Sequence, residues 1–156
     1  MATHYRGTKT ETDALNVYIK LSRAAEAVTA RINAHLKAKN LTISQFGVLE
    51  AVYHLGPMYQ NQLAEKLLKS TGNLTMVIDN LQKRHLVRRE RDPSDRRYVI
   101  IHLTEAGQQL ISGLFPQHVS HVVREIGVLS PAEQAQLEQL LKKLGLGEQT
   151  ANGSHP

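Results

Sequence analysis

Residues 70–83 combine short polar side chains with the periodicity of a helix that is apolar on one side only. Leu74, Val77, Ile78 and Leu81 recur at steps of three and four, so they share one helical face. The opposite face is polar and mostly uncharged, and it carries Gly72, Asn73, Thr75, Met76, Asp79, Asn80 and Lys83. Amides, hydroxyls and methyl groups of this kind pair with base edges in the major groove of DNA. The segment therefore has the chemistry to read a nucleotide sequence.

Positive charge is concentrated directly after this segment. The whole chain has 19 Lys and Arg against 14 Asp and Glu, a net charge of +5. Residues 83–97 alone hold seven cations and three anions, so four of the five excess charges lie within fifteen positions. Such a local cluster favours a polyanionic partner. Guanidinium groups can pair with phosphates or enter a narrow minor groove.

Individual roles follow from side-chain chemistry. Asn73 can pair with adenine, whereas Thr75 and Met76 can contact a thymine methyl group. Ser70 and Thr71 lie where the helix should begin, and hydroxyls, amides and helix dipole there favour a phosphate. Asp79 could accept from cytosine, but we expect a neighbouring arginine to hold it. The predicted DNA contacts are Ser70, Thr71, Gly72, Asn73, Thr75, Met76, Lys83, Arg88, Arg96 and Arg97.

These residues need a scaffold, and the surrounding sequence predicts one that is mainly helical. Residues 11–39 contain no Pro or Gly, and Leu21, Val28, Ile32 and Leu36 form a stripe, as in a long amphipathic helix. Thr42 and Gln45 have capping-box spacing before a helix over 44–55, which Gly56 and Pro57 end. Helices over 60–68 and from about 70 to 84 follow with a tight link, as in a helix-turn-helix.

The periodicity then changes from that of a helix to that of strands. Residues 86–91 and 98–103 alternate around a turn-forming segment with Pro93, which predicts a β-hairpin tipped by Arg96 and Arg97. Thr104 can cap a helix that runs past Pro116 with a kink or break. Ser130 and Pro131 start a last helix, which we expect Gly145 to end.

Length and composition set the class of protein. The 156 residues are 41% apolar, enough for one folded domain. We expect flexible ends at 1–10 and 147–156. The chain has no Cys, which excludes disulfides and thiolate metal sites. No signal peptide or membrane-spanning run is apparent, so we expect a cytoplasmic protein without a membrane partner.

Several strings, taken in order, resemble the multiple-antibiotic-resistance regulator (MarR) family of winged helix-turn-helix transcription factors. They are residues 41–49 (LTISQFGVL), 62–67 (QLAEKL), 72–81 (GNLTMVIDNL), 86–89 (LVRR), 92–97 (DPSDRR) and 103–107 (LTEAG). The resemblance implies a winged helix-turn-helix core over 40–104 with dimerisation helices at 11–39 and 105–146. It also implies a homodimeric, ligand-responsive repressor that binds a pseudo-palindrome in double-stranded DNA, with residues 71–84 in the major groove and the hairpin as a wing.

The family motif implies roles for two residues of the wing, and this chain departs from the family pattern at one position. Its Asp-x-Arg pattern implies that Arg97 enters the minor groove while Asp95 holds the wing in shape. The family usually has Gly where this chain has His85, at the end of the recognition helix. A left-handed residue is expected there, and His adopts that conformation at some cost.

Effector binding is the family's usual regulation, commonly by small phenolic or lipophilic anions. Tyr18, Arg23, His35 and Tyr53 could supply an aromatic wall and a cation, although ordinary packing is the simpler interpretation. His118 and His121 have metal-ligand spacing, but without a third ligand we expect surface or interface histidines and no zinc.

Two other classes of function remain as alternatives. A winged-helix module that binds proteins without reading DNA is the first, although such a module would not need the cationic wing. An enzyme is the second and less favoured, because no phosphate loop, nucleophile elbow or HExxH helix is present. The operator, the effector and the regulated genes cannot be deduced from the sequence.

Overall fold

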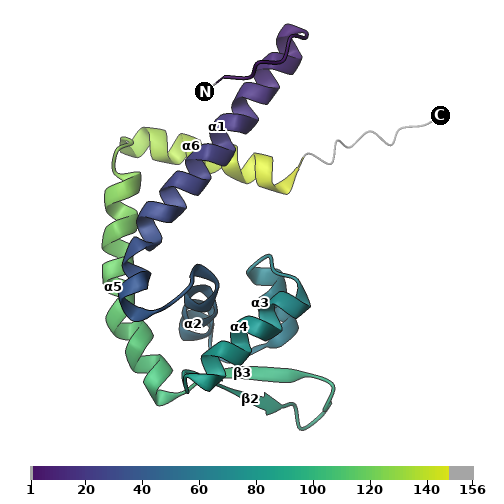
Figure 1. Ribbon diagram of the computed structural model, residues 1–156, viewed down its shortest axis with the longest axis vertical. Coiled ribbons are helices and arrows are strands. Elements are labelled where there is room, and N and C mark those ends of the chain that lie inside the picture. The colour runs from purple at the N-terminus through teal and green to yellow at the C-terminus, as the bar shows by residue number, and fades with distance from the viewer. Residues whose placement is uncertain (1, 148–156) are drawn as a thin grey trace, which may run out of the picture.

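The computed structural model describes residues 2–147 (Figure 1). Within this range the chain is mainly helical with one small sheet, as predicted. The elements in chain order are α1 (Lys9–Ile32), the 3₁₀ segment η1 (Asn33–Lys39), α2 (Ile43–Leu55), β1 (Met58–Tyr59), α3 (Gln60–Lys66), α4 (Thr71–Lys83), β2 (Val87–Arg91), β3 (Val99–Leu103), α5 (Glu105–Ile126) and α6 (Pro131–Leu146).

The hydrophobic core lies in a lobe made of α2, α3, α4, the sheet and the first half of α5. Leu49, Leu63, Ile101 and Ile111 are among its fully buried side chains. The predicted inner face of α4 is confirmed, because Leu74, Val77, Ile78 and Leu81 are all buried. This packing fixes which face of α4 remains outside.

Two helices lie outside this core. Neither α1 nor α6 has a buried residue. Figure 1 shows α1 running beside the far half of α5 and on past it, whereas α6 leads off from the far end of α5, away from the compact lobe. The α1 helix begins at Lys9, where Thr8 and Glu11 form a capping box, two residues earlier than predicted. Its α-helical bonding ends at Ile32, and residues 33–39 continue as η1.

Most predicted helix starts are confirmed. The capping boxes of Thr42 with Gln45 and Ser130 with Glu133 are both present, and the Thr104 hydroxyl accepts from Gly107. The α5 helix runs past Pro116, as predicted, and its helical bonding is not broken there. The expected end of the last helix at Gly145 was wrong, because α6 continues to Leu146, and the two-residue strand β1 was not predicted. Of the expected flexible tail at 147–156, residues 148–156 lie outside the described residues.

The sheet has the order β1-β3-β2, and both strand pairs are antiparallel. Arg89 lies opposite the buried Ile101, whereas Arg88 lies opposite His102 on the other face. Because side chains alternate along a strand, Arg89 points toward the helices and Arg88 away from them. Among residues 2–147, none of the helices combines the length and apolarity needed to span a bilayer.

Candidate DNA-binding interface

The outer face of α4 is available to a partner, as the sequence predicts. The helix starts at Ser70, whose hydroxyl accepts from the Asn73 backbone N–H at 3.3 Å. Asn73 is exposed, and the Met76 side chain is 62% exposed despite being apolar. Gly72, Asn80 and Lys83 are also exposed. The core therefore leaves a mostly polar surface uncovered along the length of α4.

Thr75 has a narrower role than its residue type allows. Its hydroxyl donates to the Thr71 carbonyl at 2.9 Å and accepts from the Gln60 side-chain amide at 3.0 Å. Since the single hydroxyl proton is committed within the chain, the methyl group is what Thr75 can offer to a base. Gln60, the first residue of α3, was not predicted, because it lies fifteen positions from Thr75 and no local pattern joins them.

Arg89 attaches the hairpin to α4. Its guanidinium lies 2.5 Å from the Asp79 carboxylate, donates to the Gln82 side chain at 3.0 Å and donates to the Thr75 carbonyl at 3.3 Å. The expectation that an arginine holds Asp79 is thus confirmed. Arg88 faces the other way and pairs with Glu90 at 2.6 Å, which lowers the pKa of that carboxyl.

The hairpin loop is built around a buried carboxylate. Asp92, only 7% exposed, accepts from the Ser94 N–H at 2.7 Å, from the Ser94 hydroxyl and from the Tyr59 hydroxyl. These donors stabilise the charged form and lower the pKa of Asp92 to about 2. The contact with Tyr59 anchors the hairpin to β1. From the sequence, Asp92 is expected only as part of the turn-forming segment around Pro93.

At the hairpin tip, Asp95 and Arg97 form a two-residue clasp. The Arg97 guanidinium reaches Asp95 at 2.6 Å, and the Arg97 backbone N–H donates to the same carboxylate at 3.1 Å. The pair lowers the pKa of Asp95 and raises that of Arg97. The Arg97 side chain nevertheless stays 85% exposed. Asp95 therefore presets the direction of a cation that remains accessible to a partner.

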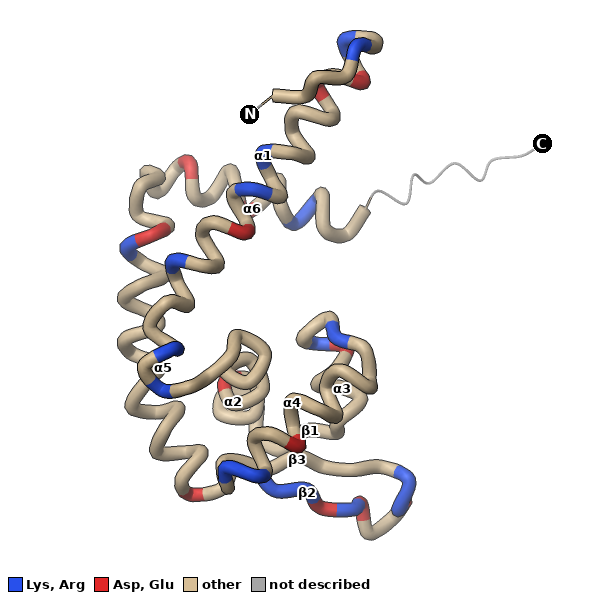
Figure 2. Tube along the Cα trace, in the orientation of Figure 1, with Lys and Arg blue, Asp and Glu red and all other residues tan. Residues whose placement is uncertain are grey.

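The helix and the hairpin tip meet at one groove. A cleft of about 270 Å³ between α3, α4 and the hairpin is lined by Gln60, Asn61, Thr71, Arg97, Tyr98 and Val99. It brings together Thr71 and Arg97, which were predicted separately. Figure 2 shows cations along β2 and at the far end of the hairpin loop. A polyanion that follows this surface would contact the helix and the hairpin together.

The turn after α4 has the conformation expected at the unusual His85. Its φ is +56°, in the left-handed region. The His85 N–H bonds to the Gln82 carbonyl at 2.9 Å and the Leu86 N–H to the Leu81 carbonyl at 3.0 Å, the pattern of a Schellman helix end. His85 thus fills the usual glycine position without changing the turn.

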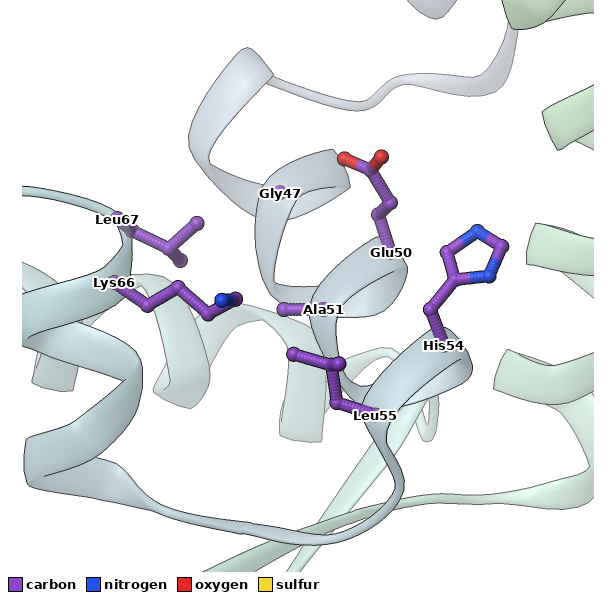
Figure 3. A pocket seen from close by; sticks show the side chains of 7 residues that line it. All are labelled: Gly47, Glu50, Ala51, His54, Leu55, Lys66 and Leu67. Atoms are coloured by element: carbon purple, nitrogen blue, oxygen red, sulfur yellow. The ribbon is translucent and has the colours of Figure 1, made fainter. Parts of the chain in front are cut away.

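The four residues considered for an effector pocket do not come together within one chain. Tyr18 and His35 share one helical stretch and lie about 25 Å apart along its axis, too far for one small ligand. Tyr18 and Arg23 are exposed on α1, while the ring of Tyr53 packs against His54 at 4.9 Å. A different cleft, of about 410 Å³, lies between α2 and α3 (Figure 3). Its lining includes Lys66, Glu50 and His54.

His118 and His121 are partly exposed and belong to a cluster of aromatic rings. His35 of η1 stacks on His121 at 4.7 Å, and His118 packs against Phe46 of α2 at 4.5 Å. Burial and the two neighbouring histidines lower the pKa of His118, which favours its neutral form. Within residues 2–147, no three His, Cys, Asp or Glu side chains are arranged to hold a metal ion.

An exposed polar helix in a tight helix pair, set beside an arginine-tipped hairpin, defines a winged helix-turn-helix DNA-binding protein. The MarR family model matches residues 41–99, which include both helices and most of the hairpin. The chain is also 35% identical over 132 residues to the HTH-type transcriptional regulator MhqR of Bacillus subtilis (strain 168), with 85% of this chain and 91% of that protein covered. The chain therefore belongs to the MarR family of transcriptional regulators.

Solved structures agree with this assignment. The MarR family regulator AbsC from Streptomyces coelicolor superposes with a TM-score of 0.80 at 25% identity, over 90% of this chain and 96% of that one. BpsR of Bordetella bronchiseptica gives a TM-score of 0.79 at 26% identity, over 94% and 100%. The latter structure concerns regulation of DNA binding by 6-hydroxynicotinic acid.

Proposed function

We propose that this regulator is a homodimeric repressor that binds a pseudo-palindromic operator and is released by a small organic anion. Each α4 would enter the major groove of one half-site, with Asn73, Met76 and the Thr75 methyl group at the bases. Arg97 would enter the adjacent minor groove, and Ser70, Thr71, Gly72, Lys83, Arg88 and Arg96 would contact the backbone. Two half-sites about one helical turn, ~10 bp, apart match the two-fold symmetry of such a dimer.

One observation supports the proposed dimer: neither α1 nor α6 has a buried residue. Helices gain most of their stability by burying an apolar face, and these two expose theirs. Val17 on α1 and Leu140 on α6 are 62% and 57% exposed, and both line an apolar cleft of about 490 Å³. Val123 on α5 adds to the same set of uncovered side chains at 65%. A second copy of these helices would cover them.

Leu140→Asp tests the dimer. A carboxylate on the proposed contact face has to be desolvated on association, so we expect a monomer at concentrations where the wild type is dimeric. Leu68→Asp is the matched control, since Leu68 is 93% exposed at the turn between α3 and α4 and lies far from α1 and α6. Sedimentation velocity measures both. A dimeric Leu140→Asp protein would contradict the proposed interface.

DNA readout is tested with an operator selected from genomic fragments by the wild-type protein. Binding should weaken steeply with salt, because each phosphate contact releases counterions. Arg97→Ala should weaken binding to all operator variants alike, whereas Asn73→Ala should change the preference at one base pair. A flat plot of log K against log[salt], or identical effects of both substitutions on every variant, would refute these roles.

The effector part of the proposal rests on the cleft between α2 and α3 (Figure 3). Lys66 supplies a cation there, and Ala51, Leu55 and Leu67 supply apolar surface, a combination suited to a small aromatic acid. 6-Hydroxynicotinic acid and simple phenolic carboxylates are suitable probes. They should release operator DNA from the wild type and fail to release it from Lys66→Gln. Equal release from both proteins would place the effector elsewhere.

A further inference from the structure

The C-terminal end of α4 is joined to the end of the α1–η1 helix by one side chain. The Arg84 guanidinium donates to the Asn40 carbonyl at 2.7 Å through Nη1 and to the Lys39 carbonyl at 3.0 Å through Nη2. These partners lie 44 and 45 positions away in the sequence. Arg84 is the C-cap residue of α4, and Asn40 is the C-cap residue of η1. The contact therefore links two helix ends directly.

The carbonyl groups at the end of η1 explain why an arginine side chain binds there. Asn40 has a left-handed φ of +52°, and the Leu36 and Lys37 carbonyls accept from the N–H groups of Leu41 and Asn40. The next exposed acceptors are the Lys39 and Asn40 carbonyls, at the negative end of the helix dipole. A planar guanidinium can donate to both at once, whereas an ammonium group lacks that fixed geometry.

The same turn is also attached to α5. The Thr104 hydroxyl, which caps α5, donates to the His85 carbonyl at 2.6 Å. Gly107 in the first turn of α5 lies so close that a Cβ on it would sit 2.0 Å from the Leu86 carbonyl oxygen. The three residues Arg84 to Leu86 thus contact both of the long helices that lead out of the DNA-binding lobe.

We propose that Arg84 is a positioning residue that sets the orientation of α4 relative to the dimerisation helices, and hence the operator spacing that the dimer accepts. This inference rests on the proposed homodimer. The α4 helix is about 20 Å long, so a change of angle at its C-terminal end displaces the base-reading residues at the other end. Moving one half-site by one base pair turns it by about 34° around the duplex axis. The dimer discriminates strongly against that change only if its two α4 helices are held in one relative orientation.

The experiment measures affinity for duplexes that carry two half-sites at the selected spacing, at spacings one base pair shorter and longer, and for one half-site alone. For the wild type we expect a strong preference for the selected spacing. For R84A we expect this preference to fall by about three- to tenfold, the effect of losing a charge-assisted hydrogen-bond pair at an exposed position. Affinity for a single half-site should stay within about twofold of the wild type.

K83A is the matched control, because it removes a neighbouring cation that does not hold η1 in the described structure. It should lower affinity by the same factor at every spacing. R84K keeps the charge and should recover only part of the spacing preference, and it supplies the same comparison if R84A does not fold. Circular dichroism and sedimentation establish fold and dimer for each variant.

Three outcomes would overturn the inference. If R84A lost affinity by the same factor at all spacings, as expected for K83A, Arg84 would be a phosphate contact. An unchanged spacing preference in both R84A and R84K would show that the link does not set the geometry. A wild-type dimer without any spacing preference would refute the proposed operator mode itself, and the role of Arg84 with it.

Discussion

His85→Gly tests whether the end of the recognition helix carries conformational strain. His85 has a φ of +56° and is exposed, and the backbone bonds around it form a Schellman end. A residue with a Cβ pays about 1–2 kcal/mol for the left-handed conformation. Glycine avoids that cost but loses about 0.5–1 kcal/mol through the greater freedom of the unfolded chain. The net expectation is a stabilisation of about 0.5–1 kcal/mol.

Urea unfolding at a fixed protein concentration measures this difference, because the stability of a dimer depends on concentration. With an m value of about 2 kcal/mol per molar urea, the midpoint should rise by about 0.3–0.5 M.

His85→Ala separates strain from the loss of the imidazole. Alanine keeps the Cβ and the cost of the left-handed conformation, so it should be no more stable than the wild type. A glycine variant that is less stable than the wild type, or an alanine variant that gains as much as glycine, would refute the reasoning. Operator spacing preference should be unchanged in His85→Gly, since Arg84 and Thr104 hold the turn from both sides.

Two further substitutions test close packing and buried charge. Gly107→Ala should destabilise the protein by more than about 2 kcal/mol in urea unfolding, because its Cβ would meet the Leu86 carbonyl at 2.0 Å. Gly113→Ala is the control, because a Cβ at Gly113 would have no atom within 4 Å. Its free energy of unfolding should rise by up to about 1 kcal/mol. Asp92 has a pKa lowered to about 2 from an ordinary value near 3.8, so the stability it contributes is present above pH 4 and lost as the pH falls toward 2. Asp92→Asn should flatten that part of the stability profile, and identical pH profiles for the two proteins would contradict this assignment.

Local chemistry was sufficient to predict the recognition helix and the hairpin. The four apolar positions of α4 and the hydroxyl of Ser70 specify a helix with one outer face, and all four are buried. The alternation over residues 98–103 likewise predicted a strand, and Ile101 is its buried residue. Such features depend on residues within one or two turns of each other, where side-chain spacing alone decides the face.

Contacts between distant segments could not be predicted in this way. The carbonyls that Arg84 holds are supplied by η1, and nothing in residues 39–40 indicates an arginine partner. The choice between Arg88 and Arg89 as the residue facing α4 depends on strand register, since a shift of one residue exchanges the two faces. For this reason the arginine that holds Asp79 could not be identified as Arg89 from the sequence.

The arrangement of these contacts restricts how an effector could act. Gln60 and Arg89 hold α4 to α3 and β2 within one lobe, whose core includes the fully buried Leu49, Leu63 and Ile78. A close-packed lobe of this kind resists internal deformation. The chain enters this lobe through η1, whose Leu36 is itself part of the core and whose seven residues form a 3₁₀ run longer than such segments usually are. An effector that changes operator binding would therefore act by altering how this lobe sits relative to α1 and the far half of α5, with α4 itself intact.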